Sequence, residues 1–169
     1  TYPNRLVHAI ELYPKHMRDI TPLFEGELYS FEDRPEKPIP DIAAGLYSIW
    51  REEQFLYVGI AGRDLNKTSS RKVRGLKDRL RAHWKGGLGG DQFAVYVFER
   101  LLAPEITRKQ LDEMGNGELT LNGLNRAFIR GNLSYRFLVT ETYAEAMSIE
   151  NQLKSGSVDN YPKPYLNPT

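Results

Sequence analysis

The clearest structural signal in the chain is the run Gly45-Leu46-Tyr47-Ser48-Ile49-Trp50-Arg51-Glu52-Glu53-Gln54-Phe55-Leu56-Tyr57-Val58-Gly59-Ile60. Two segments with strand composition, 45–50 and 55–60, flank a polar turn, which predicts a β-hairpin. Because alternate residues of a strand share a face, residues 45, 47 and 49 form one face of the first strand, and 55, 57 and 59 one face of the second. Tyrosines in strands usually pack in half-buried surfaces, so the pair alone indicates no chemistry.

Downstream of the hairpin, an apolar stripe at helical spacing predicts a helix over residues 73–84 that ends at Gly86. The continuous apolar run at 93–98 predicts a well-buried strand. Capping-box spacing predicts that helices begin at Thr107 and Thr142. A further helix is predicted around 121–129, and a further strand at 135–139.

These elements predict a mixed α+β fold of the α/β class, with a small central antiparallel sheet flanked by helices. Residues 1–41 look like an N-terminal extension that ends in a proline-rich connector at 34–40, and residues 42–169 like the domain itself. Within the domain, residues from about 91 to 132 hold one predicted strand and two predicted helices.

Composition narrows the class of protein. The chain has 169 residues, 40% hydrophobic and 27% charged, which fits one globular domain and excludes a largely disordered or coiled-coil chain. No apolar stretch is long enough to span a membrane. Without cysteine there are no disulfides, and residues 1–20 carry charges and prolines where a secretory signal would be apolar. We therefore expect a cytoplasmic protein without membrane partners.

Positive charge is concentrated in one segment. Residues 63–85 hold nine basic and two acidic residues, whereas the rest of the chain holds 14 basic and 20 acidic ones. Such local charge is typical of a protein that binds a phosphate backbone, although a solvated charged loop and helix would have the same composition. The predicted nucleic-acid contacts are Arg63, Lys67, Arg71, Lys72, Arg74, Lys77, Arg81 and Lys85.

Three further side chains are placed where they could carry chemistry. Arg79 and His83 are four residues apart on the predicted helix and share a face beside its apolar stripe. Glu150 lies beside the apolar stripe of the last helix, where a carboxylate needs a partner. A divalent cation is one such partner, and an ordinary ion pair with Lys154 is the other.

Order and spacing join these residues. Gly45-Leu46-Tyr47 is followed after nine residues by Tyr57-Val58-Gly59, then by Arg79 and His83 on one helix and by Glu150 on another. Near the C-terminus follows Pro164-Tyr165-Leu166-Asn167. This series resembles the GIY-YIG endonuclease superfamily over residues 45–167, with Leu46 and Val58 in place of isoleucines. The resemblance is to small stand-alone members, because the sequence shows no separate DNA-binding domain of the kind that other members carry. Relative to the compact members, residues from about 91 to 132 look like an insertion of a strand and two helices.

The resemblance implies a metal-dependent endonuclease that hydrolyses phosphodiester bonds in double-stranded DNA. Its implied catalytic residues are Tyr47, Tyr57, Arg79, His83, Glu150 and Asn167. Glu150 would hold one Mg²⁺ or Mn²⁺, Arg79 would stabilise the phosphate, and Tyr57 would be the general base. Tyr47 and His83 would position the water or relay its proton, and Asn167 would fix the site through hydrogen bonds.

Other functions remain open at this point. The same fold could carry a catalytically weak DNA-binding module, or a nuclease that acts on RNA or on branched nucleic acid. A protein-interaction domain with coincidental motifs is a fourth alternative. A homodimer is possible, because cutting two strands takes two active sites, but nothing in the sequence indicates one.

Overall fold

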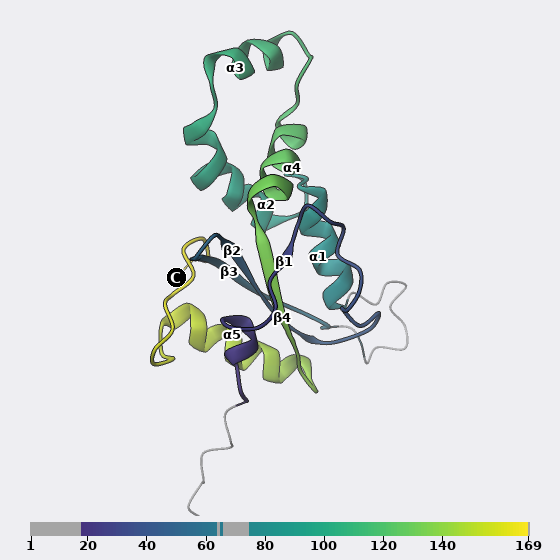
Figure 1. Cartoon of the computed structure of the whole chain (residues 1–169), viewed down its shortest axis with the longest axis vertical. Helices are drawn as coiled ribbons and strands as arrows, with labels where there is room; N and C mark the ends of the chain where they lie inside the picture. Colours follow the sequence, from purple (N-terminus) through teal and green to yellow (C-terminus); the bar gives the residue numbers. More distant parts are fainter. Residues whose placement is uncertain (1–17, 64, 66–74, 169) are drawn as a thin grey trace, which may run out of the picture.

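A four-stranded antiparallel sheet forms the centre of the molecule (Figure 1). The computed structural model describes residues 18–63, 65 and 75–168. In spatial order the strands are β1 (Tyr29–Ser30), β4 (Ser134–Val139), β2 (Gly45–Arg51) and β3 (Gln54–Ala61). The predicted hairpin is confirmed as β2 and β3, and the predicted strand at 135–139 as β4. The mixed α+β class with a small antiparallel sheet is therefore confirmed as well.

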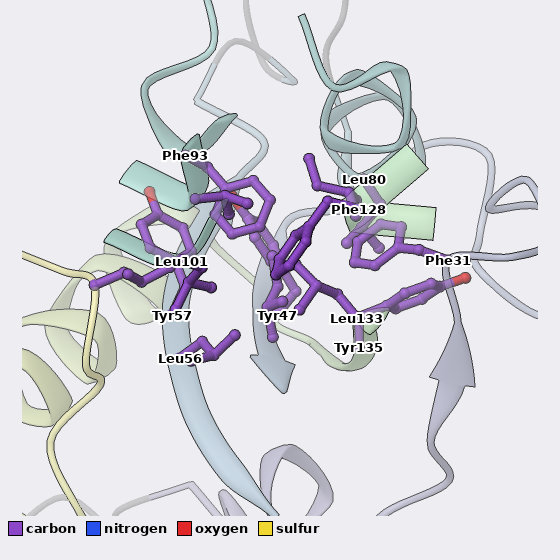
Figure 2. Packing of buried hydrophobic residues seen from close by; sticks show 14 of the residues in the cluster. Phe31, Tyr47, Leu56, Tyr57, Leu80, Phe93, Leu101, Phe128, Leu133 and Tyr135 are labelled. Carbon is purple, nitrogen blue, oxygen red and sulfur yellow. The ribbon is translucent and has the colours of Figure 1, made fainter. Parts of the chain in front are cut away.

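Helices cover both faces of this sheet. Helix α5 (Tyr143–Ser155) and the short helix η1 (Thr21–Leu23) pack on one face, where Leu46 and Trp50 of β2 point. Helices α1 (Leu76–Lys85), α2 (Gln92–Val97) and α4 (Leu121–Asn132) contribute to the core on the other face, which includes Tyr47 and Ile49. Figure 2 shows this second core, in which Tyr47, Tyr57 and Phe93 lie close together. The alternation along β2 thus divides the interior into two cores.

Only glycine fits at position 45, because β4 and α1 approach the backbone of β2 closely there. It pairs with Ala61 on one side and with Val139 on the other. A Cβ atom at this position would lie 2.2 Å from the carbonyl oxygen of Leu138 and 2.7 Å from Leu76 of α1. Any side chain would therefore push α1 and β4 away from the hairpin.

Most of the predicted helices are confirmed. Helix α1 begins at Leu76, and Gly86 ends it in the left-handed conformation; position 73, where the helix was predicted to begin, lies outside the described residues. Helix α5 begins after Thr142, whose hydroxyl accepts a hydrogen bond from the backbone N–H of Glu145, and ends at Gly156. Helix α4 occupies the predicted position.

The strand predicted at 93–98 is wrong. Residues 93–97 belong to α2, and Phe98 is the first residue of η2 (Phe98–Leu102), a π-helical segment that continues it. The buried residues Phe93, Val97 and Leu101 recur every fourth position, a helical period that extends beyond the six residues used for the prediction. A short apolar run does not distinguish a buried strand from a buried helix, and here packing in the second core selects the helix.

The segment from α2 to α4 extends away from the sheet as a helical arm (Figure 1). After η2 and η3 (Ala103–Glu105), helix α3 (Arg108–Gly115) occupies the far end of the arm. Thr107 and Gln110 form the predicted capping box at its start. Helix α3 contains no buried residue.

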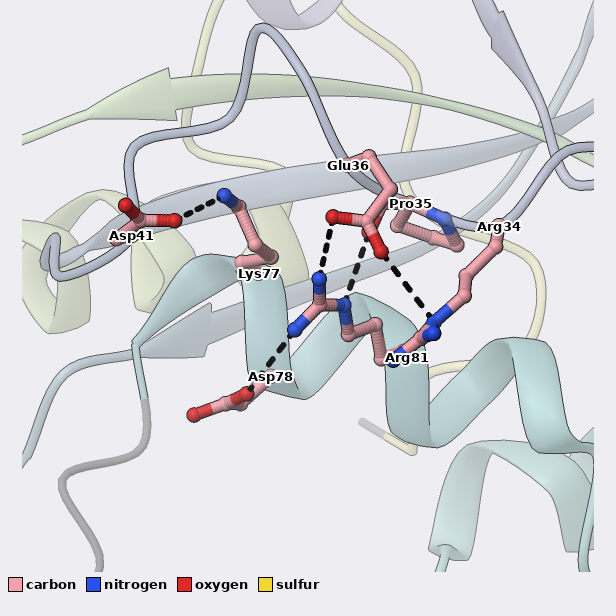
Figure 3. A network of polar contacts seen from close by, with 7 residues as sticks. All are labelled: Arg34, Pro35, Glu36, Asp41, Lys77, Asp78 and Arg81. Carbon is pink, nitrogen blue, oxygen red and sulfur yellow. Dashed lines mark hydrogen bonds and ion pairs between the residues drawn. The ribbon is translucent and has the colours of Figure 1, made fainter.

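Residues 18–41 pack onto the domain. Strand β1 pairs with β4, and Leu23 and Phe31 are fully buried. The proline-rich segment contributes Ile39 to the core and an ion-pair network to α1 (Figure 3). The described part of the predicted extension is thus continuous with the sheet. No helix in the described ranges is both long and apolar enough to cross a membrane.

Candidate active site

A groove of about 410 Å³ opens beside the second half of β3. We call it the tyrosine groove. Its lining includes residues from four separate parts of the fold, namely Tyr47, Tyr57, Arg63, Arg79, Tyr143 and Glu150. The hairpin supplies the two tyrosines, α1 supplies the arginine and α5 supplies the glutamate. Four of the six predicted catalytic residues therefore line one concave surface.

Tyr47 lies beneath the groove and has no exposed surface. Its hydroxyl oxygen is 2.8 Å from Nε2 of His83, and it accepts a hydrogen bond of 3.3 Å from Nε of Arg79. The space for this hydroxyl is provided by Gly59, which pairs with Tyr47 across the hairpin. A Cβ atom on Gly59 would lie 2.2 Å from the hydroxyl oxygen. The glycine of the second motif thus allows the tyrosine of the first to reach His83.

His83 is completely buried behind Tyr47. Its Nδ1 atom is 2.7 Å from Oδ2 of Asp91, which directly precedes α2, and the ring of Phe93 lies 4.5 Å from its own. Burial lowers the pKa of His83, against the opposing influence of the Asp91 carboxylate. The neutral imidazole is therefore the favoured form at neutral pH.

Tyr57 is the more accessible of the two tyrosines, with 8% of its surface exposed. Burial raises its pKa to about 12, although the positive charge of Arg79 acts in the opposite direction. The nearby carboxylates of Glu150 and Asp91 contribute to the increase. Tyr57 therefore carries its proton at neutral pH in the protein alone, and an added positive charge would favour its loss.

Glu150 projects from the middle of α5 into the groove, with 11% of its side chain exposed. Its Oε1 atom lies 2.9 Å from Nζ of Lys154, so the ion pair expected as the alternative to a metal is present. Within the described ranges, no cluster of three or more His, Asp or Glu side chains could hold a metal ion. One hard carboxylate in an open groove still fits Mg²⁺, which commonly takes one or two carboxylates and completes its shell with water and phosphate.

Asn167 does not line the groove. Its side chain pairs with the backbone of Val58, accepting from the N–H at 2.8 Å and donating to the carbonyl oxygen at 2.9 Å. The preceding residues, Tyr165 and Leu166, donate backbone hydrogen bonds to Phe55 and Leu56. The C-terminal segment therefore follows the outer edge of β3 up to Val58, which lies between two residues that line the groove, Tyr57 and Gly59. Asn167 contacts the strand that carries Tyr57 rather than the groove itself.

The predicted nucleic-acid contacts divide into three groups. Arg63 lines the tyrosine groove, and its guanidinium lies 5.8 Å from the ring centre of Tyr143. Arg81 and Lys85 line a second groove, of about 810 Å³, which also includes Arg79 and Asp91. We call this second cavity the α1 groove. The third group consists of Lys77 and of four residues that lie outside the described ranges, namely Lys67, Arg71, Lys72 and Arg74.

The prediction for Lys77 needs correction. Only 7% of this residue is exposed, and its ammonium group forms an ion pair with Asp41 (Figure 3). Arg81 is also engaged, because it pairs with Glu36 and donates a hydrogen bond of 3.1 Å to the carbonyl oxygen of Pro35. Both side chains connect α1 to the proline-rich segment. Lys77 therefore has a structural partner and does not present its charge to solvent.

Sequence reasoning missed Asp91 and Tyr143. Asp91 occupies the N-cap position of α2, where an aspartate ordinarily accepts a hydrogen bond from the first turn, but its side chain makes no such bond. The carboxylate binds His83 instead. The sequence predicts a strand at 93–98, and a strand there gives no reason to expect a contact between Asp91 and His83 of α1. Tyr143 gave no signal beyond its position at the start of α5.

Comparisons of the chain with protein-family models, with curated proteins and with solved structures found no match.

Proposed function

We propose that the chain is a metal-dependent endonuclease that hydrolyses phosphodiester bonds in DNA, in the manner of GIY-YIG enzymes. The observation that carries the proposal is that Tyr57, Arg79 and Glu150 line one groove although they come from β3, α1 and α5. Phosphodiester hydrolysis needs a proton acceptor, a cation and a fixed donor near the phosphate. The groove offers a side chain for each of these tasks.

Arg79 is suited to hold the phosphate. A guanidinium group has five N–H donors, and the hydrogen bond to Tyr47 uses Nε–H. Among residues 18–63, 65 and 75–168 the two terminal nitrogens have no further partner, so they can form a fork with two phosphate oxygens, which a lysine could not do. Since Arg79 is half-buried, its charge acts on the phosphate with less screening than a surface charge would.

Tyr57 is suited to receive the proton of the attacking water. Tyr57 would first release its own proton to solvent. The water oxygen would then bond to phosphorus as one water proton passes to the phenolate of Tyr57, while the bond from phosphorus to the leaving oxygen breaks and that oxygen takes up a proton from solvent. Glu150 would hold one Mg²⁺ or Mn²⁺, which would offset the negative charge that develops on the phosphate. Arg79 supplies part of the positive charge that favours the phenolate. Lys154 would give up its ion pair with Glu150 as the site is loaded.

The local positive charge around Arg79 supports a nucleic acid as the partner, and the resemblance to GIY-YIG enzymes favours double-stranded DNA. Arg63 lies in the tyrosine groove and Lys85 in the α1 groove, on the two sides of Arg79. In the sequence, the basic segment 66–74 connects these two regions. Phosphate contacts of this kind would make binding strongly dependent on salt. The absence of cysteine supports a cytoplasmic location as part of the proposal.

The test compares wild type with Glu150→Gln and with a matched control, Glu145→Gln, which changes the other glutamate of α5. We expect Glu150→Gln to reduce Mg²⁺-dependent cleavage of duplex DNA by roughly 10²- to 10³-fold, because a bound cation contributes several kcal/mol of charge stabilisation. DNA affinity and melting temperature should change little, since glutamine keeps the size of the side chain and the charge of Lys154, whose side chain is 29% exposed, can be solvated when the pair is lost. Glu145→Gln should cleave as wild type does.

Other outcomes distinguish the alternatives. Wild-type cleavage by Glu150→Gln would reject Glu150 as the metal ligand. Salt-sensitive binding without cleavage would favour a DNA-binding module, and faster cleavage of RNA or branched DNA would change the substrate class. If the wild-type chain binds no nucleic acid, the whole proposal fails.

A further inference from the structure

Four side chains form one continuous chain of hydrogen bonds. Two of them belong to α1, one belongs to β2, and the last precedes α2. Arg79 contacts Tyr47 at 3.3 Å, Tyr47 contacts His83 at 2.8 Å, and His83 contacts Asp91 at 2.7 Å. Arg79 stands at one end, between the tyrosine groove and the α1 groove. Asp91, 6% exposed, stands at the other. The two ends carry opposite charges, and the two neutral side chains between them are completely buried.

The direction of each hydrogen bond follows from the chemistry of the two ends. Arginine is only a donor, so the hydroxyl oxygen of Tyr47 accepts from Nε of Arg79. The single hydroxyl proton of Tyr47 then has Nε2 of His83 as its acceptor. A neutral imidazole that accepts at Nε2 carries its proton at Nδ1, and Oδ2 of Asp91 accepts that proton. Every bond therefore donates in the same direction, from Arg79 toward Asp91.

We infer that Asp91 is a positioning residue of the proposed nuclease site, which fixes the Nδ1–H tautomer of His83 and through Tyr47 sets the orientation of Arg79. This inference rests on the proposed function, in which Arg79 holds the phosphate. If His83 were protonated at Nε2 instead, two donors would meet at the Tyr47 hydroxyl and its proton would have no acceptor in this network. The buried hydroxyl would then reorient, and Arg79 would lose its anchor.

The surroundings of Asp91 support this role. Its Oδ1 atom is buried and has no hydrogen-bond partner, and its side chain does not cap α2 although it occupies the N-cap position. A buried carboxylate with one unused oxygen is costly, so the contact with His83 is the interaction that holds it. Although burial acts in the opposite direction, the contact with His83 and the positive charge of Arg79 contribute to keeping the pKa of Asp91 below its ordinary value. The other titratable groups near His83 are Tyr57 from β3 and Arg79 from its own helix.

The first experiment measures the tautomer directly. In ¹⁵N-labelled wild-type protein at neutral pH, the shifts of the His83 ring nitrogens should show a neutral imidazole with its proton on Nδ1. A proton on Nε2, or a charged ring, would overturn the inference whether or not the protein cleaves DNA. This measurement needs no variant and no substrate.

The second experiment replaces Asp91 by asparagine, whose amide can donate to Nδ1 and so favour the other tautomer. We expect Asp91→Asn to move the proton of His83 to Nε2 and to lower kcat by roughly 100-fold, the effect of misplacing a catalytic group by about 1 Å. KM should change little, because other basic residues hold the DNA. Asp159→Asn, which alters an exposed aspartate that lines neither groove, is the matched control and should retain wild-type kcat.

The outcomes separate the two proposals. Failure of the wild-type chain to cleave any nucleic acid would reject the nuclease function even if His83 has the expected tautomer. Wild-type kcat in Asp91→Asn, with cleavage by the wild type established, would reject the role of Asp91 alone. A lower melting temperature with unchanged kcat would show that the carboxylate is only a structural element.

Discussion

Replacing Asn167 by alanine tests how the C-terminal segment supports the candidate site. The side chain makes two hydrogen bonds to the backbone of Val58, at 2.8 and 2.9 Å, and Val58 has no exposed surface. Alanine at position 167 keeps the backbone of the segment but removes both bonds. The change therefore separates the amide from the rest of the C-terminal contacts.

The expected loss of stability can be worked from these two contacts. A buried backbone donor or acceptor that loses its partner costs about 1–3 kcal/mol, and here one of each is left. Water that enters the strand edge would reduce the cost, so we expect a total of about 2–4 kcal/mol. For a chain of this size, each kcal/mol lowers the melting temperature by about 2–4 °C. The expected decrease is therefore about 5–15 °C.

Chemical denaturation and thermal melting of the purified chain measure this effect. Asn151→Ala is the control, because Asn151 is exposed on α5 and the same substitution there should change the free energy of unfolding by less than about 0.5 kcal/mol. Wild-type stability in Asn167→Ala would refute the argument that the amide holds β3. A stable but inactive Asn167→Ala would show instead that the amide acts within the groove.

Two further predictions concern charge. The first neutralises Arg71, Lys72 and Arg74 together, three basic residues that lie outside the described ranges. This change should weaken binding about equally for all DNA sequences and flatten the salt dependence of binding. Unchanged binding at low salt would contradict it. Burial lowers the pKa of His83 in the folded state, so below about pH 6.5 the unfolded chain binds a proton that the folded chain does not. Stability should therefore fall as pH decreases from 6.5 toward the folded pKa, and His83→Gln should show a shallower dependence in denaturation series over this window. Equal slopes for the two proteins would contradict the assignment of a buried neutral histidine.

The sequence predicted the elements whose signals are local. The hairpin 45–60 has strand composition on both sides of a polar turn, and α5 has a threonine cap at one end and Gly156 at the other. The grouping of Tyr57, Arg79 and Glu150 came from the order of motifs, not from periodicity, because no local rule states that α5 packs beside β3.

What the sequence did not predict depends on packing between distant segments. Residues 93–98 form a helix because Phe93, Val97 and Leu101 share one face against the core, and six residues were too few to show that period. Once that segment was misassigned, the contact between Asp91 and His83 could not be foreseen. The burial of Lys77 depends on Asp41, which belongs to a segment that the sequence presented as a connector.

Helix α3 at the end of the arm has a further consequence. With no buried side chain, its stability comes from the capping box and from two exposed ion pairs, Arg108–Asp112 and Lys109–Glu113, which together contribute about 1–2 kcal/mol. An eight-residue helix held by so little opens while the sheet stays folded. Its amide protons should exchange with solvent long before those of β2. The tip of the arm is therefore a place where a label, an insertion or a fused domain would leave the tyrosine groove undisturbed.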